Sequence, residues 1–481
     1  MMATHDVLYR IVLAVNYFSL FYVITVSTIY LIQLISASVG LRRYVRSLRY
    51  IDYRRFLDSE HMVPISLLVP AYNESATIVD SVRNLISLDF PEYEVIVIND
   101  GSKDDTLQLL IDAYELLPFH QPYKKSLETE EIVEIYRSAV DEKLIVLNKK
   151  NGGKADALNA GINVASYPVI VTIDADSILE KSSLIKIIYS FVSDPTCIAV
   201  GGIVRIGSGC EIVDGQMKTV GLSKNPVVAL QTTEYLRAFL TGRIGFDVLG
   251  MLLIISGAFG AFNKAAVIEA GGYTRNCVGE DMELVVKLHQ LMHDKKRKYS
   301  VRFLPDPICW TQPPEHMRDL KKQRKRWHIG LIDTLLRHKK MLFNPKYGRI
   351  GTVCLPYYWI FELAGPLIET FGYVFIPISF LLGVVNLWFM LSFFLVAVLY
   401  GTILSVGALL LEENTFKKYP DIKQLLQLFF YSFVDNFGYR QLNTVFRVEA
   451  TFGFKKNKSR WGELKRKGFS SNETKTENKK S

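Results

Sequence analysis

Cysteine is scarce in this sequence, and its spacing excludes two kinds of site. The 481 residues include five cysteines, none of them in a C-x-x-C pair: Cys197, Cys210, Cys277, Cys309 and Cys354. An odd, scattered set argues against a disulfide framework or a zinc site and fits a reducing cytosol. Sequence signatures of DNA- or RNA-binding domains are missing as well. We therefore expect no nucleic-acid partner.

Charge is missing from long stretches near both ends of the chain. Ile11–Gly40 has no charged residue. As a helix it would span about 45 Å, more than a hydrocarbon core of about 30 Å, so it predicts one tilted or overlong transmembrane helix. It is too long for a signal peptide and lacks a small-residue cleavage site. Asn386–Leu411 is also uncharged, and we predict transmembrane helices near 366–388 and 390–411, with an interfacial helix before them.

Basic residues gather beside these apolar stretches and give the chain a formal net charge of +9. The first stretch is followed by six arginines, Arg42, Arg43, Arg46, Arg49, Arg54 and Arg55, and residues 455–467 are rich in lysine. By the positive-inside rule both groups face the cytoplasm, where anionic lipid attracts them. Leu425–Val448 is amphipathic and either lies in the interface or re-enters the membrane.

Four regions follow from these patterns. Residues 1–60 form a transmembrane helix, about 11–38, and a basic cytoplasmic linker. Residues 61–345 form a cytosolic domain. Residues 346–448 form interfacial and transmembrane helices, and 449–481 a basic, partly disordered cytoplasmic tail. We expect a multi-pass protein of the plasma membrane.

The cytosolic region alternates between strands and helices. Apolar runs lie in the segments that begin at Ile65, Glu94, Lys143 and Val169. Each run is followed by a turn and then by apolar residues at helical spacing. This alternation predicts an α/β fold with a doubly wound, mostly parallel sheet. The polar segment Pro118–Val140 reads as a surface insertion without visible chemistry.

Two aspartates follow the apolar run VIVTI, in the sequence Asp174-Ala175-Asp176. In open α/β sheets, ligands bind outside the carboxyl ends of the strands. Carboxylate oxygens suit Mg²⁺ or Mn²⁺, which usually share their coordination with substrate phosphates. The motif therefore predicts a metal-bridged diphosphate site; the alternative is a loop that caps the following helix.

Three further groups could carry chemistry, each with an ordinary alternative. Asp100 ends a strand and could accept hydrogen bonds from uracil or ribose, or be a turn aspartate in N-D-G. Lys154 follows two glycines at a helix start, where backbone amides can approach a phosphate, but it could be a surface lysine. Glu280 and Asp281 open a helix, so one could be a general base or both could cap it.

The last group is Gln323, Arg326 and Trp327, in the pattern Q-x-x-R-W. At helical spacing Gln323 and Arg326 share a face, with Trp327 beside it. A guanidinium could neutralise a departing diphosphate, and an indole could stack on a sugar. A basic helix lying on a membrane surface is the alternative.

In this order, and flanked by membrane helices, the motifs resemble the processive family 2 glycosyltransferases, which include cellulose, hyaluronan and poly-β-1,6-N-acetylglucosamine synthases. The resemblance covers roughly residues 60–410. It implies a Rossmann-like domain of the nucleotide-sugar transferase (GT-A) type and membrane helices that export the glycan. Its partners would be a UDP-sugar, a growing polysaccharide, the bilayer and accessory export subunits.

The resemblance also implies a role for each residue. Asp100 would contact the uridine and Lys154 the diphosphate, and Asp174 and Asp176 would hold Mg²⁺ or Mn²⁺. Asp281 would be the base, whereas Glu280, Gln323, Arg326 and Trp327 would line the acceptor and pyrophosphate site. The segment Ser256–Gly260 matches an acceptor-lining stretch.

Two departures from the family stand out. The usual T-E-D reads Gly279-Glu280-Asp281 here, and no Arg-rich cyclic-dinucleotide module follows the last helix. The implied activity is inverting, processive polymerisation of UDP-N-acetylglucosamine or UDP-glucose. The alternatives are transfer of one sugar to a lipid carrier and an inactive scaffold subunit of an export complex.

Overall fold

The computed structural model describes residues 2–53, 56, 62–120, 122–213, 216–417, 419 and 421–457. Arg54 and Arg55 of the predicted linker, and the predicted tail from 458 onward, lie outside the described residues. The chain divides into two compact units. The sheet unit comprises the described parts of Tyr44–Lys224 together with Gly250–Pro313, and the helical unit comprises the described parts of Met1–Arg43 and Pro314–Lys458 together with Asn225–Leu249.

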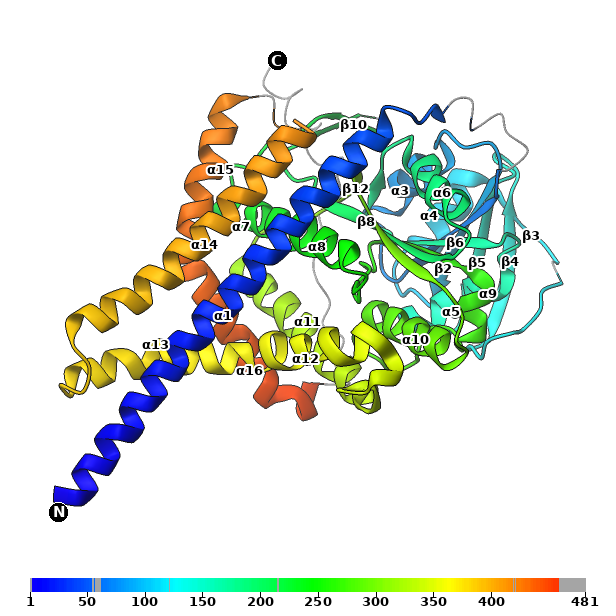
Figure 1. The fold of residues 1–481 in the computed structure, drawn as a ribbon. Coiled ribbons are helices and arrows are strands. Elements are labelled where there is room, and N and C mark those ends of the chain that lie inside the picture. Colours follow the sequence, from blue (N-terminus) through cyan, green and yellow to red (C-terminus); the bar gives the residue numbers. More distant parts are fainter. Residues whose placement is uncertain are drawn as a thin grey trace. The chain divides into compact units, whose positions relative to one another are not determined.

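The centre of the sheet unit is four parallel strands built from the apolar runs. Their order is β5, β2, β1, β6, with bounds Leu144–Lys149, Tyr93–Asp100, Ile65–Ala71 and Val169–Ile173. Every residue of β2 and β6 is buried, as expected for strands covered on both faces. Helices α3, α4 and α5 follow β1, β2 and β5, with bounds Ile78–Ile86, Thr106–Tyr114 and Lys154–Val164 (Figure 1).

Antiparallel strands extend this core on both sides. Beyond β6 come β11 (Phe259–Asn263), β8 (Cys197–Ile206), β12 (Ser300–Thr311) and β7 (Ile178–Leu179), and β12 runs parallel to β8. The strands β3 (Leu116–Pro118), β5, β2, β1, β6, β8 and β12 run one way, and β4 (Ile132–Ser138), β11 and β7 the other. The helices that connect the strands beyond β6 along the chain include α6 (Ser183–Ser193), α9 (Lys264–Glu269) and α10 (Glu280–Asp294). The predicted α/β fold with a mostly parallel sheet is confirmed.

The prediction for Pro118–Val140 was wrong in one respect. Residues Ile132–Ser138 form strand β4, which pairs antiparallel with β5 and with the short edge strand β3 (Leu116–Pro118). Buried and accessible side chains mix along β4, as on a strand near a sheet edge. The polar segment Pro118–Val140 therefore contains a strand that the sequence pattern did not predict.

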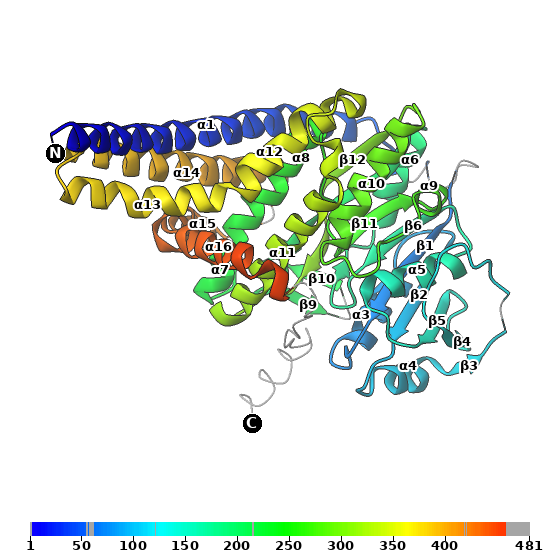
Figure 2. The same cartoon turned by 90° about the horizontal axis from the view of Figure 1, so that it is seen from below.

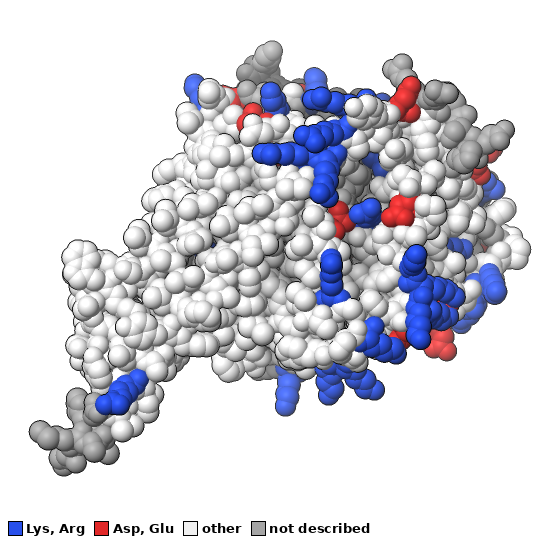
Figure 3. Space-filling view, in the orientation of Figure 1, with Lys and Arg blue, Asp and Glu red and all other residues white. Residues whose placement is uncertain are grey.

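Three helices of the helical unit are long and apolar enough to cross a membrane, judged by length and composition. These spans are Tyr9–Leu48 in α1 (Met2–Leu48), Ile350–Leu381, which ends with α13 (Gly365–Leu381), and Leu387–Thr415, which is α14. Tyr22, Val23 and Val26 of α1 pack with Ile376 of α13 and Phe393 of α14, and the three helices run side by side in Figure 2. Their outer surface is almost free of charge in Figure 3. Such a surface suits lipid better than water.

The remaining helices of this unit carry paired polar groups. They are α7 (Pro226–Tyr235), α8 (Arg243–Val248), α11 (Met317–Arg337), α15 (Ile422–Val434) and α16 (Arg440–Asn457). The amphipathic stretch predicted at 425–448 is broken between α15 and α16 at Gly438, whose φ is 97°. Arg447 of α16 pairs with Glu362 over 2.9 Å, and Arg237 pairs with Asp435. In both of these pairs a partly or fully buried charge has an opposite charge beside it.

Candidate active site

The predicted acidic residues of the sheet unit lie at one rim of the sheet. Asp100 is the last residue of β2, Lys149 is the last of β5, and Asp174 follows β6 directly. Asp100 and Lys149 are register partners in neighbouring parallel strands. Because parallel strands end at the same edge, these groups meet where α/β sheets bind ligands.

The carboxylate of Asp100 is held by four donors from the chain. Its Oδ1 accepts from Lys149 Nζ at 2.5 Å and from the Gly152 amide at 3.0 Å. Its Oδ2 accepts from the Gly153 amide at 2.8 Å and from Asn151 Nδ2 at 3.2 Å. The two glycine amides therefore donate to Asp100, and their approach to a phosphate stays a prediction.

Both glycines of this turn are required by its geometry. Gly153 has a φ of 86°, which a side chain disfavours, and it is the N-cap residue of α5. A Cβ on Gly152 would come within 2.5 Å of the Asp156 carboxylate. The tight turn brings Lys154, the first residue of α5, to the rim.

Lys154 lies among three carboxylates. Its Nζ is 2.5 Å from Asp174 Oδ1 and 3.9 Å from Glu280 Oε1, and it donates to the Gly257 carbonyl over 3.4 Å. Burial alone would lower the pKa of Lys154, but the charges of Asp174, Glu280 and Asp281 raise it above its usual value. This lysine is a fixed cation and not a surface lysine.

Asp281 lies in the first turn of α10, next to the segment 256–260. Its Oδ2 accepts from the Gly257 amide over 3.1 Å, and its Oδ1 accepts from the Met282 amide over 2.8 Å. Glu280 beside it is buried. Asp281 also lies in the first turn of the helix, where the helix dipole favours a negative charge. The capping alternative and a chemical role for Asp281 are therefore compatible.

The D-x-D motif lies in a turn between β6 and β7. The Ser177 amide donates to the Asp174 carbonyl over 3.0 Å, whereas α6 begins only at Ser183, with Ser182 as its N-cap. The motif therefore does not cap that helix, and the alternative is wrong. Burial raises the pKa of the Cys309 thiol, and the carboxylates of Asp174 and Asp176 raise it further, so both lie near one sulfur.

The donor set of this turn fits a hard divalent cation that also binds phosphates. Across the described ranges, no three His, Cys, Asp or Glu side chains are grouped so that they could hold a metal ion. Magnesium, however, is usually bound through one or two carboxylates together with substrate phosphates and water. Asp174 and Asp176 supply two carboxylates.

Sequence reasoning missed three residues of this region. Lys149 and Asp156 have fully buried side chains and pair over 2.7 Å. Burial raises the pKa of Tyr273, and the charges of Asp281, Glu280 and Asp174 raise it further, so this phenol lies close to the acidic group. The position of Lys149 at the end of a predicted strand was the available signal.

The Q-x-x-R-W residues belong to the helical unit, on α11. Trp327 is 39% exposed, with the Arg324 guanidinium 4.3 Å from its ring centroid and the rings of Tyr235 and Phe239 within 6.4 Å. The structure thus surrounds this indole with other planar groups.

The motif also contains a glutamine with an unsatisfied polar atom. The buried Oε1 of Gln323 has no hydrogen-bond partner within the described chain. Arg324, which is not part of the motif, forms a largely buried ion pair with Glu234 at 2.8 Å, and the role of Arg326 stays a prediction.

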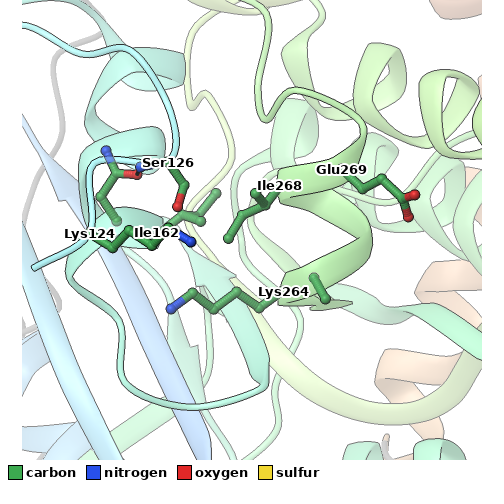
Figure 4. Close-up of a pocket in the computed structure, with 8 residues that line it drawn as sticks. Lys124, Ser126, Ile162, Lys264, Ile268 and Glu269 are labelled. Carbon is green, nitrogen blue, oxygen red and sulfur yellow. Dashed lines mark hydrogen bonds between the residues drawn. The ribbon is translucent and has the colours of Figure 1, made fainter.

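The pocket drawn in Figure 4 is a separate feature of the sheet unit. Its volume is about 350 Å³, and its lining includes Lys124, Ser126, Ile162, Lys264 and Ile268. No residue of the predicted site lines it.

Comparison with known proteins agrees with these motifs. Residues 63–330 match the family described as "Glycosyltransferase like family 2". The poly-beta-1,6-N-acetyl-D-glucosamine synthase of Staphylococcus aureus strain COL is 31% identical over 297 residues, 61% of each chain. The synthase of the same name from Staphylococcus epidermidis is 32% identical over 281 residues, 58% of each chain. The match thus spans less than two thirds of these relatives.

Among solved structures, a mannosyltransferase of Pyrobaculum calidifontis in complex with GDP-Man and Mn²⁺ is similar. It is 18% identical, with a TM-score of 0.47, over 85% of this chain and 99% of that one. Likeness at this level does not bear on function. The family match covers more than half of the sequence, and this chain therefore belongs to glycosyltransferase family 2.

Proposed function

We propose that this protein is a membrane-bound, inverting and processive β-glycosyltransferase that polymerises UDP-N-acetylglucosamine, or UDP-glucose, into an exported polysaccharide. The observation that carries the proposal is the cluster of Lys154, Asp174, Glu280 and Asp281, joined through hydrogen bonds to Gly257. It sets a cation for a diphosphate beside a carboxylate for an acceptor hydroxyl. The names of the staphylococcal relatives favour N-acetylglucosamine as the sugar.

In this proposal Asp281 removes the proton from the acceptor hydroxyl as its oxygen attacks the anomeric carbon. The C–O bond to UDP breaks in the same step, so one carboxylate base is sufficient. The two amides that donate to Asp281 hold its carboxylate in place before the acceptor arrives. Lys154 and Arg326 stabilise the charge that develops on UDP.

Asp174 and Asp176 would hold Mg²⁺ or Mn²⁺ against the diphosphate, and the ion would supply further charge stabilisation for the leaving group. Asp100 contacts the nucleoside. Its weakest bond, at 3.2 Å to Asn151, is the one that a uracil or ribose donor can replace. Gln323 and Trp327 line the acceptor. The protein would work with its catalytic unit in the cytoplasm and its helices in the plasma membrane, with accessory export subunits.

The test is a panel of radiolabelled UDP-sugars, offered with Mn²⁺ or Mg²⁺ to membranes that contain this chain. We expect label from UDP-N-acetylglucosamine in a polymer that a β-N-acetylglucosaminidase digests. Membranes that carry the empty vector are the control. Label in a one-sugar lipid, or no release of UDP from any sugar nucleotide, would contradict the proposal.

A further inference from the structure

Lys149 is a buried cation that no step of the proposed reaction uses. Its side chain is fully buried, and its Nζ contacts Asp100 Oδ1 at 2.5 Å, Asp156 Oδ1 at 2.7 Å and the Lys150 carbonyl at 2.6 Å. A buried lysine is costly unless several acceptors surround it. Here three oxygens from three elements of the sheet unit meet one ammonium group.

The three oxygens belong to segments that the site needs in register. Asp100 ends β2, Lys150 directly follows β5, and Asp156 is in the first turn of α5. Asp100 in turn accepts the amides of Gly152 and Gly153, the residues before Lys154. One cation therefore fixes both the nucleoside carboxylate and the turn that carries the diphosphate lysine.

The charges continue outward to the surface. Asp156 Oδ2 lies 3.0 Å from Arg275 Nε, and Arg275 pairs with Glu130, whose amide donates to the Asp156 carboxylate. Lys149 and Arg275 thus pair with the carboxylates of Asp100, Asp156 and Glu130. The charge of Lys149 screens the repulsion between Asp100 and Asp156. Without Lys149 two buried carboxylates would repel, and Asp100 would move away from the turn.

We propose that Lys149 is a positioning residue, which holds Asp100 and the Gly152–Lys154 turn in the arrangement that binds the UDP moiety. This inference rests on the proposed function. It predicts that Lys149 acts on donor binding through its partners and touches neither the donor nor the acceptor. The neighbouring Lys150 is the matched control, because it is 64% exposed and pairs only with Glu131 on the surface.

The experiment measures UDP affinity by calorimetry, and KM and kcat for the donor, with the full-length protein in detergent. For Lys149→Met we expect the Kd for UDP and the donor KM to rise about ten- to a hundredfold, the range for groups that orient ligands. The kcat at saturating donor should fall much less. Lys149→Arg should restore part of the affinity, and Lys150→Met should match the wild type.

A second pair of variants guards against misfolding. Asp156→Asn combined with Lys149→Met removes one charge of each sign, so the net charge of the buried site is unchanged, and Asp156→Asn alone is its reference. The double variant should bind UDP about tenfold or more weakly than Asp156→Asn at an equal melting temperature. Equal affinity in these two proteins would overturn the inference.

One measurement needs no variant. In the wild type without nucleotide, hydrogen exchange at the Gly152 and Gly153 amides should be slow, because both donate to Asp100. Exchange as fast as in an open turn would count against the inference. If the wild type bound no UDP at all, the proposed function itself would fail, and the two failures are thus distinct.

Discussion

Lys154 Nζ lies 2.5 Å from Asp174 Oδ1, and this contact joins the first turn of α5 to the end of β6. The pair neutralises part of the negative charge that Asp174, Glu280 and Asp281 bring to one place. A bound diphosphate with its metal ion would replace this internal compensation. The ligand of the proposed function, a diphosphate with its metal ion, carries charges of both signs, as this cluster does.

Asp281→Asn should remove the base and keep the size of the side chain. Asparagine has one oxygen that can accept from Gly257, it loses the acceptor for the Met282 amide, and its own amide cannot take a proton at neutral pH. We expect transfer to fall by about 10²–10⁴-fold, with the Kd for UDP nearly unchanged. Initial rates of sugar incorporation and calorimetry with UDP measure the two effects. Turnover near the wild-type rate would remove Asp281 from the base role.

Lys154→Met should raise the donor KM, with Lys150→Met as a control on the surface. The pH dependence has a definite sign. The surrounding carboxylates raise the pKa of Lys154, so the charged form and its contribution to donor affinity persist at lower pH and are lost only as pH rises through that raised value. We expect UDP affinity that is level from about pH 7 to about pH 10. A loss of affinity centred near pH 8 would show that another group binds the diphosphate.

Chelation by EDTA should stop the reaction, and Mn²⁺ or Mg²⁺ should restore it. Asp176→Asn should raise the metal concentration for half-maximal rate by about tenfold, equivalent to about 1.4 kcal/mol. Asp112→Asn, at an exposed position on α4, serves as the control. Activity that EDTA leaves intact would mean that Asp174 and Asp176 hold no metal.

His289 makes the sheet unit sensitive to acid. Burial lowers its pKa to about 4, and its ring lies 2.7 Å from the Tyr299 hydroxyl and 2.9 Å from the Leu252 carbonyl. The unfolded chain binds this proton near pH 6.5, so stability falls as pH drops from about 6.5 to about 4. At pH 5 the loss should be about 2 kcal/mol.

Thermal unfolding at pH 7 and pH 5 measures this effect. His289→Gln should lose less stability between the two pH values than the wild type, because glutamine takes up no proton. An equal loss in both proteins would assign the acid sensitivity to other groups.

The elements that the sequence predicts best are those that one physical rule determines. Short apolar runs that alternate with helical segments indicate buried strands, and parallel strands end together, so Asp100 and Asp174 were expected at one rim. Glu280 and Asp281 were singled out because two carboxylates open a helix, and the role of Asp281 as the base stays a prediction. Each of these inferences needed only local pattern and sheet direction.

Other features depend on contacts between distant segments. Lys149 looks like a solvated charge in K-K-N-G-G-K, and only the pairing of β2 with β5 shows that Asp100 lies beside it. The direction of the Gly152 and Gly153 amides depends on the same pairing. Strand β4 was missed because a strand near a sheet edge keeps polar side chains in water. Tertiary packing brings Tyr273 close to the carboxylates of Asp174, Glu280 and Asp281, and no local sequence pattern predicts this.

The most direct test of the central claim is the length of the product made by purified protein in lipid vesicles. With UDP-N-acetylglucosamine and Mn²⁺, we expect long chains early in the reaction, while most of the donor is still unused, and one UDP released per sugar added. Electrophoresis of labelled product and a coupled assay for UDP record both quantities. A product of one sugar on a lipid, or no product with every UDP-sugar tried, would contradict the account.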